Sequence, residues 1–181
     1  LNTSLYVNKT TDVFQFARRE SVDFVNGVPL IISSPINIGE EYRTGFEFTL
    51  NYSPYKWWKL NSNFNFFAVQ TRGDFTYTDF NGNKVVQNFD NDATSWSTRL
   101  TSKITLPAKI DWQTNMSYNG PQANAQGKRL GVFGMNLAFS KDVLKDKGTV
   151  AFNISDVFNS RKMISETYLP GIVSSYSEMQ W

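Results

Sequence analysis

The feature that most constrains the fold of this chain is a series of segments in which apolar and polar residues alternate one by one. Between residues 46 and 53 the order is Phe-Glu-Phe-Thr-Leu-Asn-Tyr-Ser, and between residues 60 and 66 it is Leu-Asn-Ser-Asn-Phe-Asn-Phe. A period of two places successive side chains on opposite faces of an extended strand. The chain is therefore expected to be all-β, with strands whose two faces meet different environments.

The composition excludes several classes of protein. A net charge of only +2 over 181 residues offers no broad basic surface for nucleic acid. No stretch contains the roughly 20 consecutive apolar residues that a membrane-spanning helix needs. Without cysteine or histidine the chain forms no disulfide and lacks the commonest general base and metal ligand. A mean hydropathy of −0.39 is compatible with a transmembrane β-barrel, because only alternate strand residues face lipid.

The alternation and the turn residues between segments predict seven strands. They cover approximately residues 4–20, 30–53, 59–68, 95–106, 110–118, 132–139 and 149–155. Asn26-Gly27 is expected to close a hairpin, because both residue types tolerate positive φ. Residues 75–93 are expected to form a further strand pair closed by a type I′ turn at Asn81-Gly82. Residues 122–128 are expected to form a polar loop, and residues 159–181 a long loop.

The connections between these strands alternate in length, which is the asymmetry of a transmembrane barrel. Short connections fall at residues 53–58, 107–109 and 144–147, and long ones fall at residues 69–93, 119–128 and from 159 onward. Trp and Tyr gather near the strand ends, where such residues form belts at the lipid headgroups. The predicted membrane-interface aromatics are Tyr52, Tyr55, Trp57, Trp58, Trp96, Trp112 and Tyr118.

The strands of a soluble β-sandwich also alternate apolar and polar residues, so the alternation alone does not identify the environment of the polar face. The polar faces here are mostly Asn, Ser, Thr and Gln, whereas a soluble surface usually carries more Lys and Glu. The turn pair Trp57-Trp58 also suits a headgroup region better than a sandwich core. We therefore predict an antiparallel up-and-down transmembrane β-barrel with a polar lumen. The candidate lumen-facing residues are Glu47, Asn61, Asn63, Asn65, Arg99, Lys103, Gln113 and Asn115.

The acidic residues do not form a convincing chemical site. Residues 88–92, Asn-Phe-Asp-Asn-Asp, offer oxygen ligands but lack the glycine of a calcium-binding EF-hand loop. Glu40-Glu41 and the pair Asp74 and Asp79 have no His or Cys partner and no fixed separation. Asp156 breaks the alternation of its strand and is expected at the polar end of that strand or at a bulge. We predict no catalytic residue, metal or cofactor, and no enzyme activity.

Four stretches, in order along the chain, share their residues with a known family. They are Asn37-Ile38-Gly39 through Arg43-Thr44-Gly45-Phe46-Glu47, Tyr52-Ser53-Pro54-Tyr55-Lys56-Trp57-Trp58-Lys59-Leu60-Asn61, Ala125-Gln126-Gly127-Lys128, and Ile154-Ser155-Asp156-Val157-Phe158-Asn159-Ser160-Arg161-Lys162. Together they resemble the C-terminal barrel region of TonB-dependent outer-membrane receptors, in particular the group with an outer-membrane-protein β-barrel domain. The resemblance covers about residues 6–162, and none of the stretches is a catalytic signature.

The resemblance implies a barrel of about 22 strands, preceded by a plug domain and located in the bacterial outer membrane. Residues 1–181 would then be a C-terminal segment of the barrel, without the plug, the earlier strands and the final strand. The implied function is active uptake of a nutrient such as a siderophore or an oligosaccharide. The implied partners are outer-membrane lipid, the rest of the barrel, the plug, the TonB energy-transducing complex and, in some receptors, a surface lipoprotein.

Other functions stay open from the residues alone. One is a soluble secreted or periplasmic β-barrel that binds a small apolar ligand. Another is a barrel that acts as a structural or secretion partner in an envelope complex. A β-sandwich hydrolase of polysaccharide would need paired acids on a concave face, and no convincing pair is present.

Overall fold

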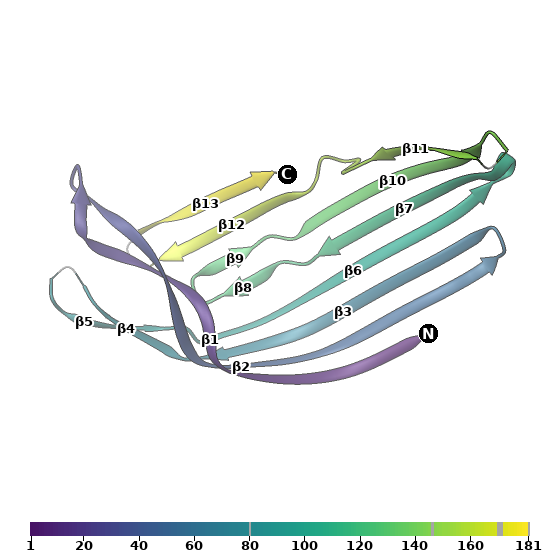
Figure 1. The fold of residues 1–181 in the computed structure, drawn as a ribbon. Coiled ribbons are helices and arrows are strands. Elements are labelled where there is room, and N and C mark those ends of the chain that lie inside the picture. Colours follow the sequence, from purple (N-terminus) through teal and green to yellow (C-terminus); the bar gives the residue numbers. More distant parts are fainter. Residues whose placement is uncertain (80, 146, 170–171, 181) are drawn as a thin grey trace.

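The protein is a curved, strand-rich shell in a computed structural model that describes residues 1–79, 81–145, 147–169 and 172–180 (Figure 1). Seven strands form one antiparallel sheet in the order β1-β2-β3-β6-β7-β10-β11. Their bounds are β1 Asn2–Val25, β2 Val28–Tyr55, β3 Trp58–Arg72, β6 Asn91–Leu106, β7 Ile110–Asn119, β10 Val132–Val143 and β11 Gly148–Ile154. The sheet curves into a half-barrel, so the predicted partial barrel of seven antiparallel strands is confirmed. No helix in the described residues is long and apolar enough to cross a membrane.

Three tight turns lie together at one end of this sheet (Figure 1). The first joins Tyr55 to Trp58, which pair across it. The second is a 3₁₀ turn at Pro107–Lys109, in which Ala108 has a φ of 63°. The third follows Val143, the last residue of β10, and Leu144 and Lys145 in it both have positive φ. These are the three connections that the sequence predicted to be short.

At the opposite end the two longest strands leave the plane of the sheet. We call residues 12–39, the far part of the β1–β2 hairpin, the arm. Asp12 in β1 has a φ of 53°, and Gly39 in β2 lies so close to β3 that a Cβ there would be 1.8 Å from the carbonyl oxygen of Arg72. The arm bends away from the sheet and is closed by Asn26 and Gly27, both at positive φ, as predicted (Figure 1).

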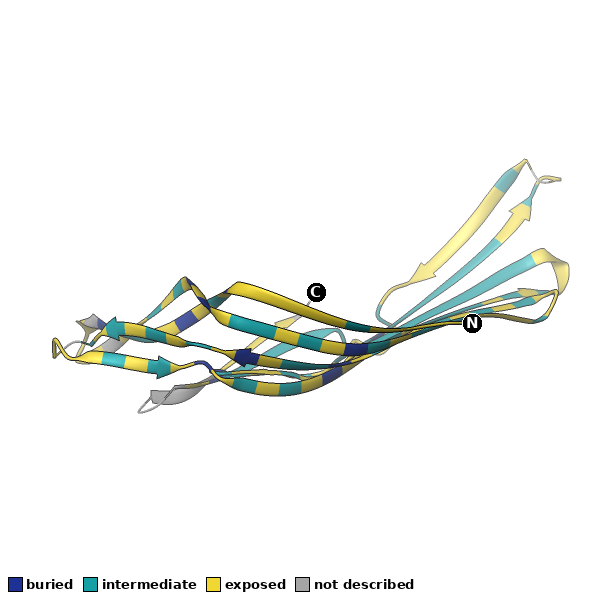
Figure 2. Ribbon diagram, turned by 90° about the horizontal axis from the view of Figure 1, so that it is seen from below, coloured by how far each residue is buried: buried dark blue, intermediate teal, exposed yellow. Residues whose placement is uncertain are grey.

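The arm supplies most of the small hydrophobic core. The core residues are Val13, Ala17, Ile36, Ile38 and Phe89, with Phe75 and Ala125 packed against them. Figure 2 shows that buried residues are few along the ribbon, and that most of the sheet is exposed or half-buried. The molecule therefore has one packed end and a long wall that is a single sheet thick.

Two segments predicted to be loops contain strands instead. Residues 122–128 include β8 (Gln122–Asn124) and the start of β9 (Gly127–Arg129), and residues 159–181 include β12 (Lys162–Leu169) and β13 (Ile172–Gln180). They form a second sheet in the order β13-β12-β9-β8. The prediction was wrong because these strands are held mainly by backbone pairing, and the first two are too short for an alternating pattern to stand out.

The predicted strand pair between residues 75 and 93 is present as β4 (Asp74–Thr78) and β5 (Lys84–Asn88). Its connection is longer than the predicted two-residue type I′ turn. Asp79 Oδ1 accepts hydrogen bonds from the backbone N–H groups of Asn81 (2.9 Å) and Asn83 (2.7 Å). The Asp79 side chain therefore organises a wider loop, in which Gly82 alone supplies the positive φ of 82° among the described residues.

Candidate functional site

The register of the seven-stranded sheet separates its two faces cleanly. On one face, Leu100 pairs with Ser62 and Met116, and Met116 pairs with Met135. Two rows further on the same face, Ile104 pairs with Trp58 and Trp112, and Trp112 pairs with Phe139. The other rows of this face add further large apolar side chains, namely Leu5, Phe46, Phe48, Leu50, Phe64, Phe66, Leu60, Phe133, Leu137, Phe152 and Ile154. We call this surface the apolar face.

Five of the seven predicted interface aromatics lie on the apolar face, and they fall into two belts. Trp96 and Tyr118, with ring centroids 4.6 Å apart, lie toward the arm end. Tyr52, Trp58 and Trp112 lie toward the tight turns. Trp112 pairs with Ile104, eight positions along β6 from Trp96, which at ~3.3 Å per residue and a tilt of ~45° separates the belts by roughly 19 Å along the membrane normal.

The remaining two predicted aromatics belong to the turn between β2 and β3. The rings of Tyr55 and Trp57 are parallel with centroids 5.1 Å apart, and Trp57 stacks on Trp58 at 6.2 Å. The indole Nε1 of Trp58 donates to Ser102 Oγ at 3.0 Å, so the polar tip of this ring is satisfied. The three rings form one exposed aromatic stack at the end of the sheet. The position of both belts at lipid headgroups stays a prediction.

All eight predicted lumen candidates share the opposite face, which we call the polar face. In register order Asn63 pairs with Thr49 and Arg99, Asn61 with Asn51 and Thr101, and Lys103 with Lys59 and Gln113, while Glu47 pairs with Asn65 and Asn115 with Thr101. Because every one of them projects from the same side of the sheet, they form a continuous polar surface. That this surface lines a lumen stays a prediction.

Side-chain hydrogen bonds cross the polar face from strand to strand. Asn63 Nδ2 donates to Thr49 Oγ1 at 3.1 Å, and Thr101 Oγ1 donates to Asn115 Oδ1 at 3.0 Å. Lys103 Nζ lies 2.8 Å from the carboxylate of Asp111. Such a network satisfies the polar side chains and leaves many amide groups able to bind water or a polar partner.

One member of this surface was missed by the sequence analysis. Tyr6 in β1 lies over Gly45, where a Cβ would be 2.3 Å from the phenol ring. Its hydroxyl donates to Asn65 Oδ1 at 3.1 Å. The signal was a glycine inside a strand, which often marks a close approach of another group.

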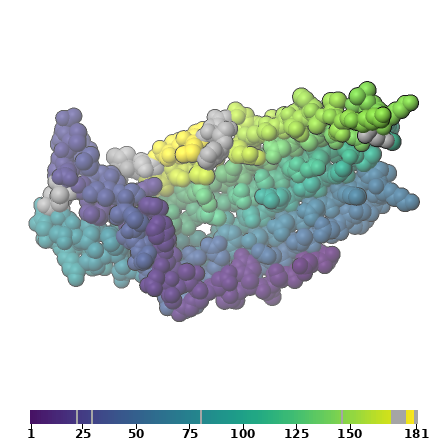
Figure 3. All heavy atoms as spheres, in the orientation of Figure 1, coloured from purple at the N-terminus to yellow at the C-terminus, as the bar shows by residue number. Residues whose placement is uncertain are grey.

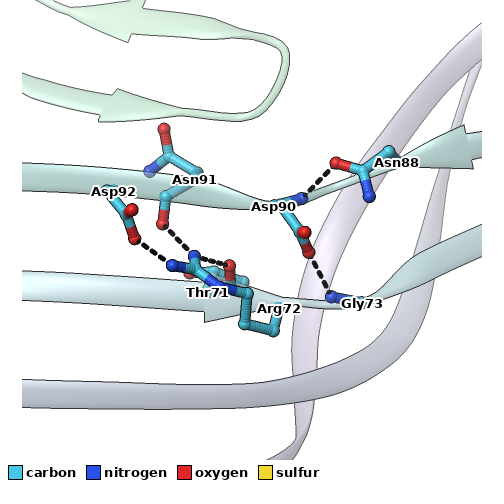
Figure 4. Close-up of polar contacts among 7 residues, drawn as sticks. All are labelled: Thr71, Arg72, Gly73, Asn88, Asp90, Asn91 and Asp92. Atoms are coloured by element: carbon cyan, nitrogen blue, oxygen red, sulfur yellow. Dashed lines mark hydrogen bonds and ion pairs between the residues drawn. The ribbon is translucent and has the colours of Figure 1, made fainter.

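The acidic residues near the arm end join strands and have protein partners (Figure 4). Asp92 Oδ1 lies 2.7 Å from Arg72 Nη2, and Asp90 Oδ1 accepts the Gly73 N–H at 3.0 Å. Asn88 Oδ1 in turn accepts the Asp90 N–H at 2.9 Å. In the described part of the chain, no three His, Cys, Asp or Glu side chains are grouped so that they could hold a metal ion.

The neighbouring carboxylates Glu40 and Glu41 are divided between the two faces. Glu40 forms an ion pair of 2.7 Å with Lys9 and accepts a hydrogen bond from Tyr42 Oη, whereas Glu41 pairs with Arg43 at 3.3 Å. The hydrogen bond to Glu40 raises the pKa of Lys9 to about 12. The bond from Lys9 in turn lowers the pKa of Glu40 below its ordinary value. Acid–base work by the two carboxylates together is excluded by this separation.

Asp156, which breaks the alternation, lies just beyond the end of β11 at Ile154. Its φ is 46°, and its carboxylate accepts the backbone N–H groups of Ser160 (3.1 Å) and Arg161 (3.0 Å). The residue therefore caps a turn and does not face the apolar environment. This turn carries Arg161 onto the polar face, which the sequence analysis did not predict.

Two adjoining cavities are hollowed into the polar face, with volumes of about 380 and 460 Å³. Arg99, Ser117 and Arg161 line both of them, and Arg129 lines the larger one. A third cavity, of about 270 Å³, lies between the arm and the second sheet and is lined by Arg18, Gln126 and Thr167 among others. The polar face is thus the part of the molecule with the shape and the chemistry of a binding surface.

The whole chain, residues 1–181, matches the model of the outer membrane protein beta-barrel family. The chain belongs to this family. No curated protein and no solved structure matches it. As a member of the outer membrane protein beta-barrel family the protein is located in the outer membrane, and its two-faced sheet is a piece of barrel wall. The alternative of a soluble secreted or periplasmic barrel is not favoured by this membership.

Proposed function

We propose that this outer-membrane barrel protein is a TonB-dependent receptor that imports a nutrient such as a siderophore or an oligosaccharide. Residues 1–181 then form a C-terminal segment of the barrel, with a plug domain and earlier strands before it and a final strand after it. The four stretches that resemble such receptors support this proposal, and so does membership of the barrel family. The sheet contributes the wall of the barrel and one side of its lumen.

The observation that carries the proposal is the continuous polar face. Across β2, β3, β6, β7 and β10 it presents amide and hydroxyl groups, many of which retain free hydrogen-bonding capacity. A barrel with a purely structural role needs only enough polar groups to hydrate its lumen. A lumen that holds a movable plug and passes a polar solute needs many exchangeable hydrogen bonds, and this face supplies them.

The partners follow from this assignment. Lipid contacts the apolar face and the aromatic belts, and the edge strands β1 and β11 pair with the rest of the barrel. The plug occupies the lumen beside the polar face, and the TonB complex supplies the energy that moves the plug. A surface lipoprotein is a further partner at the end that carries the arm.

Uptake by cells that lack the gene tests the proposed function. Growth is compared with a ferric siderophore as the sole iron source, or an oligosaccharide as the sole carbon source, in the deletion strain, the complemented strain and a strain without active TonB. We expect one substrate to support growth only when both the gene and TonB are intact. Normal growth on every substrate, together with a defect in secretion or envelope integrity, would instead favour the structural or secretion barrel.

The domain proposal has its own measurement, the intact mass of the native polypeptide from a detergent-solubilised outer-membrane fraction. We expect a mass several-fold above the 20.7 kDa of residues 1–181. A mass near that value would contradict the large plugged barrel while leaving the assignment to the outer membrane unchanged.

A further inference from the structure

Three arginines from three separate elements meet around the two cavities of the polar face. Arg99 comes from β6, Arg129 from β9, and Arg161 from the turn that precedes β12. They are far apart in the sequence, and only Arg99 follows the alternating pattern of a wall strand. The fold therefore gathers positive charge at one place on a face that is otherwise mostly neutral.

The geometry brings Arg99 and Arg161 to either side of one serine. Arg99 pairs with Ser117 across β6 and β7, and Ser117 pairs with Gly134 across β7 and β10. Neighbouring strands are ~4.8 Å apart, so the backbones of the first and last residues of this row are roughly 10 Å apart. Nε and Nη2 of Arg161 lie 3.2 Å from where a Cβ on Gly134 would be, so its guanidinium lies directly over that glycine.

The absence of a side chain at residue 134 is what admits Arg161. Gly134 is buried, and the space that a larger residue would fill is occupied by the guanidinium. The Ser117 hydroxyl lies beside the same point, 3.5 Å from the absent Cβ. Arg161, Ser117 and Arg99 thus line a single hollow in that order.

The charge of this hollow is not balanced by acidic side chains. None of the described residues that line either cavity is Asp or Glu. In the part of the chain that the structure describes, the Arg99 guanidinium forms no hydrogen bond or ion pair, and Arg129 binds the neutral side chain of Gln122. Arg161 donates only a long bond of 3.5 Å to Asn136 Oδ1.

The nearest carboxylate to Arg161 is already engaged. Asp156 accepts the backbone N–H groups of Ser160 and Arg161 and contacts Ser160 Oγ at 3.4 Å. It attracts the Arg161 charge but does not line the cavities. Most of the guanidinium donors in the hollow are consequently available to a ligand.

We propose that this hollow is a binding site for an oxyanion, a carboxylate or phosphate group held between Arg99 and Arg161 with Ser117 as a further donor. Guanidinium groups bind such oxyanions through two parallel hydrogen bonds, which fixes their orientation as well as neutralising them. The oxyanion belongs either to a solute in the lumen or to an acidic side chain of the same polypeptide. The site goes beyond the proposed uptake function, because it would exist in a barrel of any role.

Chemical modification of the native protein in outer-membrane vesicles tests the site. Phenylglyoxal modifies accessible arginines, and peptide mass spectrometry gives the rate for each one, with and without inorganic phosphate or citrate. If a solute is the ligand, either anion slows modification of Arg99 and Arg161. Arg72, which is paired with Asp92 away from the hollow, serves as the internal control and should not respond.

The phosphate affinity of substituted proteins tests which residues form the site. We expect Arg99→Gln and Arg161→Gln each to weaken phosphate binding about tenfold in titrations of the purified protein, as loss of one charge-assisted contact does. Lys59→Gln removes the same charge from the polar face outside the cavities and should leave binding unchanged. Gly134→Ala, which keeps every charge but displaces the Arg161 guanidinium, should weaken binding in the same direction.

If the ligand is a carboxylate of the same polypeptide, it protects the arginines from phenylglyoxal even without added anion. Cross-linking is then the measurement that detects it. Arg99→Lys places an amine at the hollow, and carbodiimide then joins that amine to a carboxylate in direct contact. A cross-link to an Asp or Glu of the same polypeptide establishes this source. The proposal is overturned if both arginines react rapidly and no anion protects them. It is also overturned if the arginines react slowly without added anion and Arg99→Lys gives no cross-link to the same polypeptide, or gives one only to another protein.

Discussion

The arm and the wall are built from the same long hairpin, yet they bury their apolar residues in different ways. In the arm, Ala17 and Ile38 are 0% and 2% exposed, because β1 and β2 fold over onto residues from other elements. In the wall, Leu5 of the same β1 is 83% exposed and Phe152 of β11 is 62% exposed. The alternating pattern is common to both regions, so it does not by itself decide where the apolar side chains go.

This difference indicates which environment buries the apolar side chains of each region. The arm shares a hydrophobic interior with residues from other elements, although its outer side still carries the exposed pair Phe14 and Phe16. The described part of the wall is a single sheet, and we expect lipid to cover its apolar face. We therefore expect the arm to be stabilised by side-chain packing and the wall by the membrane together with backbone pairing.

The largest expected effect is in the core of the arm. Replacing Ile38 with alanine should lower stability by about 4 kcal/mol, because it removes a fully buried aliphatic side chain and leaves a cavity. Hydrogen exchange of the protein in lipid vesicles should lose protection in residues 12–39 and keep it in β6 and β7. Ile32→Ala, at a half-buried site in the same strand, is the matched control, and equal losses in both variants would contradict a packed arm.

The second effect is in the wall, where a charge should be tolerated on one face only. Leu100→Arg places a cation on the apolar face near its middle row and should lower stability in lipid by about 3 kcal/mol. Thr101→Arg adds the same charge at the next residue, which lies on the polar face, and should lower stability in lipid much less. Urea titration of both variants folded into vesicles measures the two values. A similar loss in each would mean that the two faces meet the same solvent.

The third effect concerns the fastening of the arm to the second sheet. Gln126 is buried, and its amide accepts the Arg18 N–H at 2.9 Å and donates to the Arg18 carbonyl at 2.8 Å. Gln126→Ala should lower stability by about 2 kcal/mol, because it leaves both backbone groups of Arg18 without a partner. Gln70→Ala, at an exposed position of β3, should have little effect. Thermal unfolding of the two variants makes the comparison.

The smallest effect is the dependence on pH of the pair formed by Lys9 and Glu40, which lies beyond the apolar rows. The pKa of Glu40 is lowered in the folded protein, mainly by the hydrogen bond from Lys9, so its contribution is present above about pH 4.5 and is lost as the pH falls through the folded pKa. The raised pKa of Lys9 keeps the pair intact up to at least pH 10.5, and its contribution is lost as the pH rises through about 12. Both groups are exposed, so the effect on melting temperature should be small.

A comparison of the wild type with Glu40→Gln between pH 7 and pH 3 isolates this contribution. The two proteins should differ at pH 7 and converge as the pH falls. A difference that grows toward low pH would contradict the assigned sign.

The wall could be predicted from the sequence because a single sheet with one apolar and one polar face has a strict two-residue period. Each of the strands near residues 46–53, 60–66 and 110–118 repeats the same two-residue pattern, and the register of the structure places its apolar members on one face. The end of the strand before the second tight turn followed from Pro107, and the closing turn of the arm followed from Asn26-Gly27. The same period also placed the eight polar candidates on a common face.

The arm and the arginine hollow could not be predicted in this way. The bend depends on a positive φ at Asp12 and on the approach of Gly39 to β3, neither of which interrupts the alternation. Arg161 reaches the polar face only because the Asp156 turn carries it there. These features arise from contacts between segments distant in sequence, and the alternating pattern of one segment does not predict such contacts.

The arm rises at one end of the wall (Figure 3). The second sheet binds the β1 strand of the arm through the side chains of Gln126 and Thr167, both of which contact Arg18. The β1–β2 ladder, in contrast, pairs the two strands along most of their length, apart from an irregularity between Glu20 and Phe24. A force applied to the turn at Asn26-Gly27 would therefore act on the three hydrogen bonds of Arg18 and on the small hydrophobic core, while the wall would share any load among many backbone hydrogen bonds. We expect single-molecule pulling to release the arm at low force and the wall only at high force, so that the molecule is a stiff shell with one compliant end.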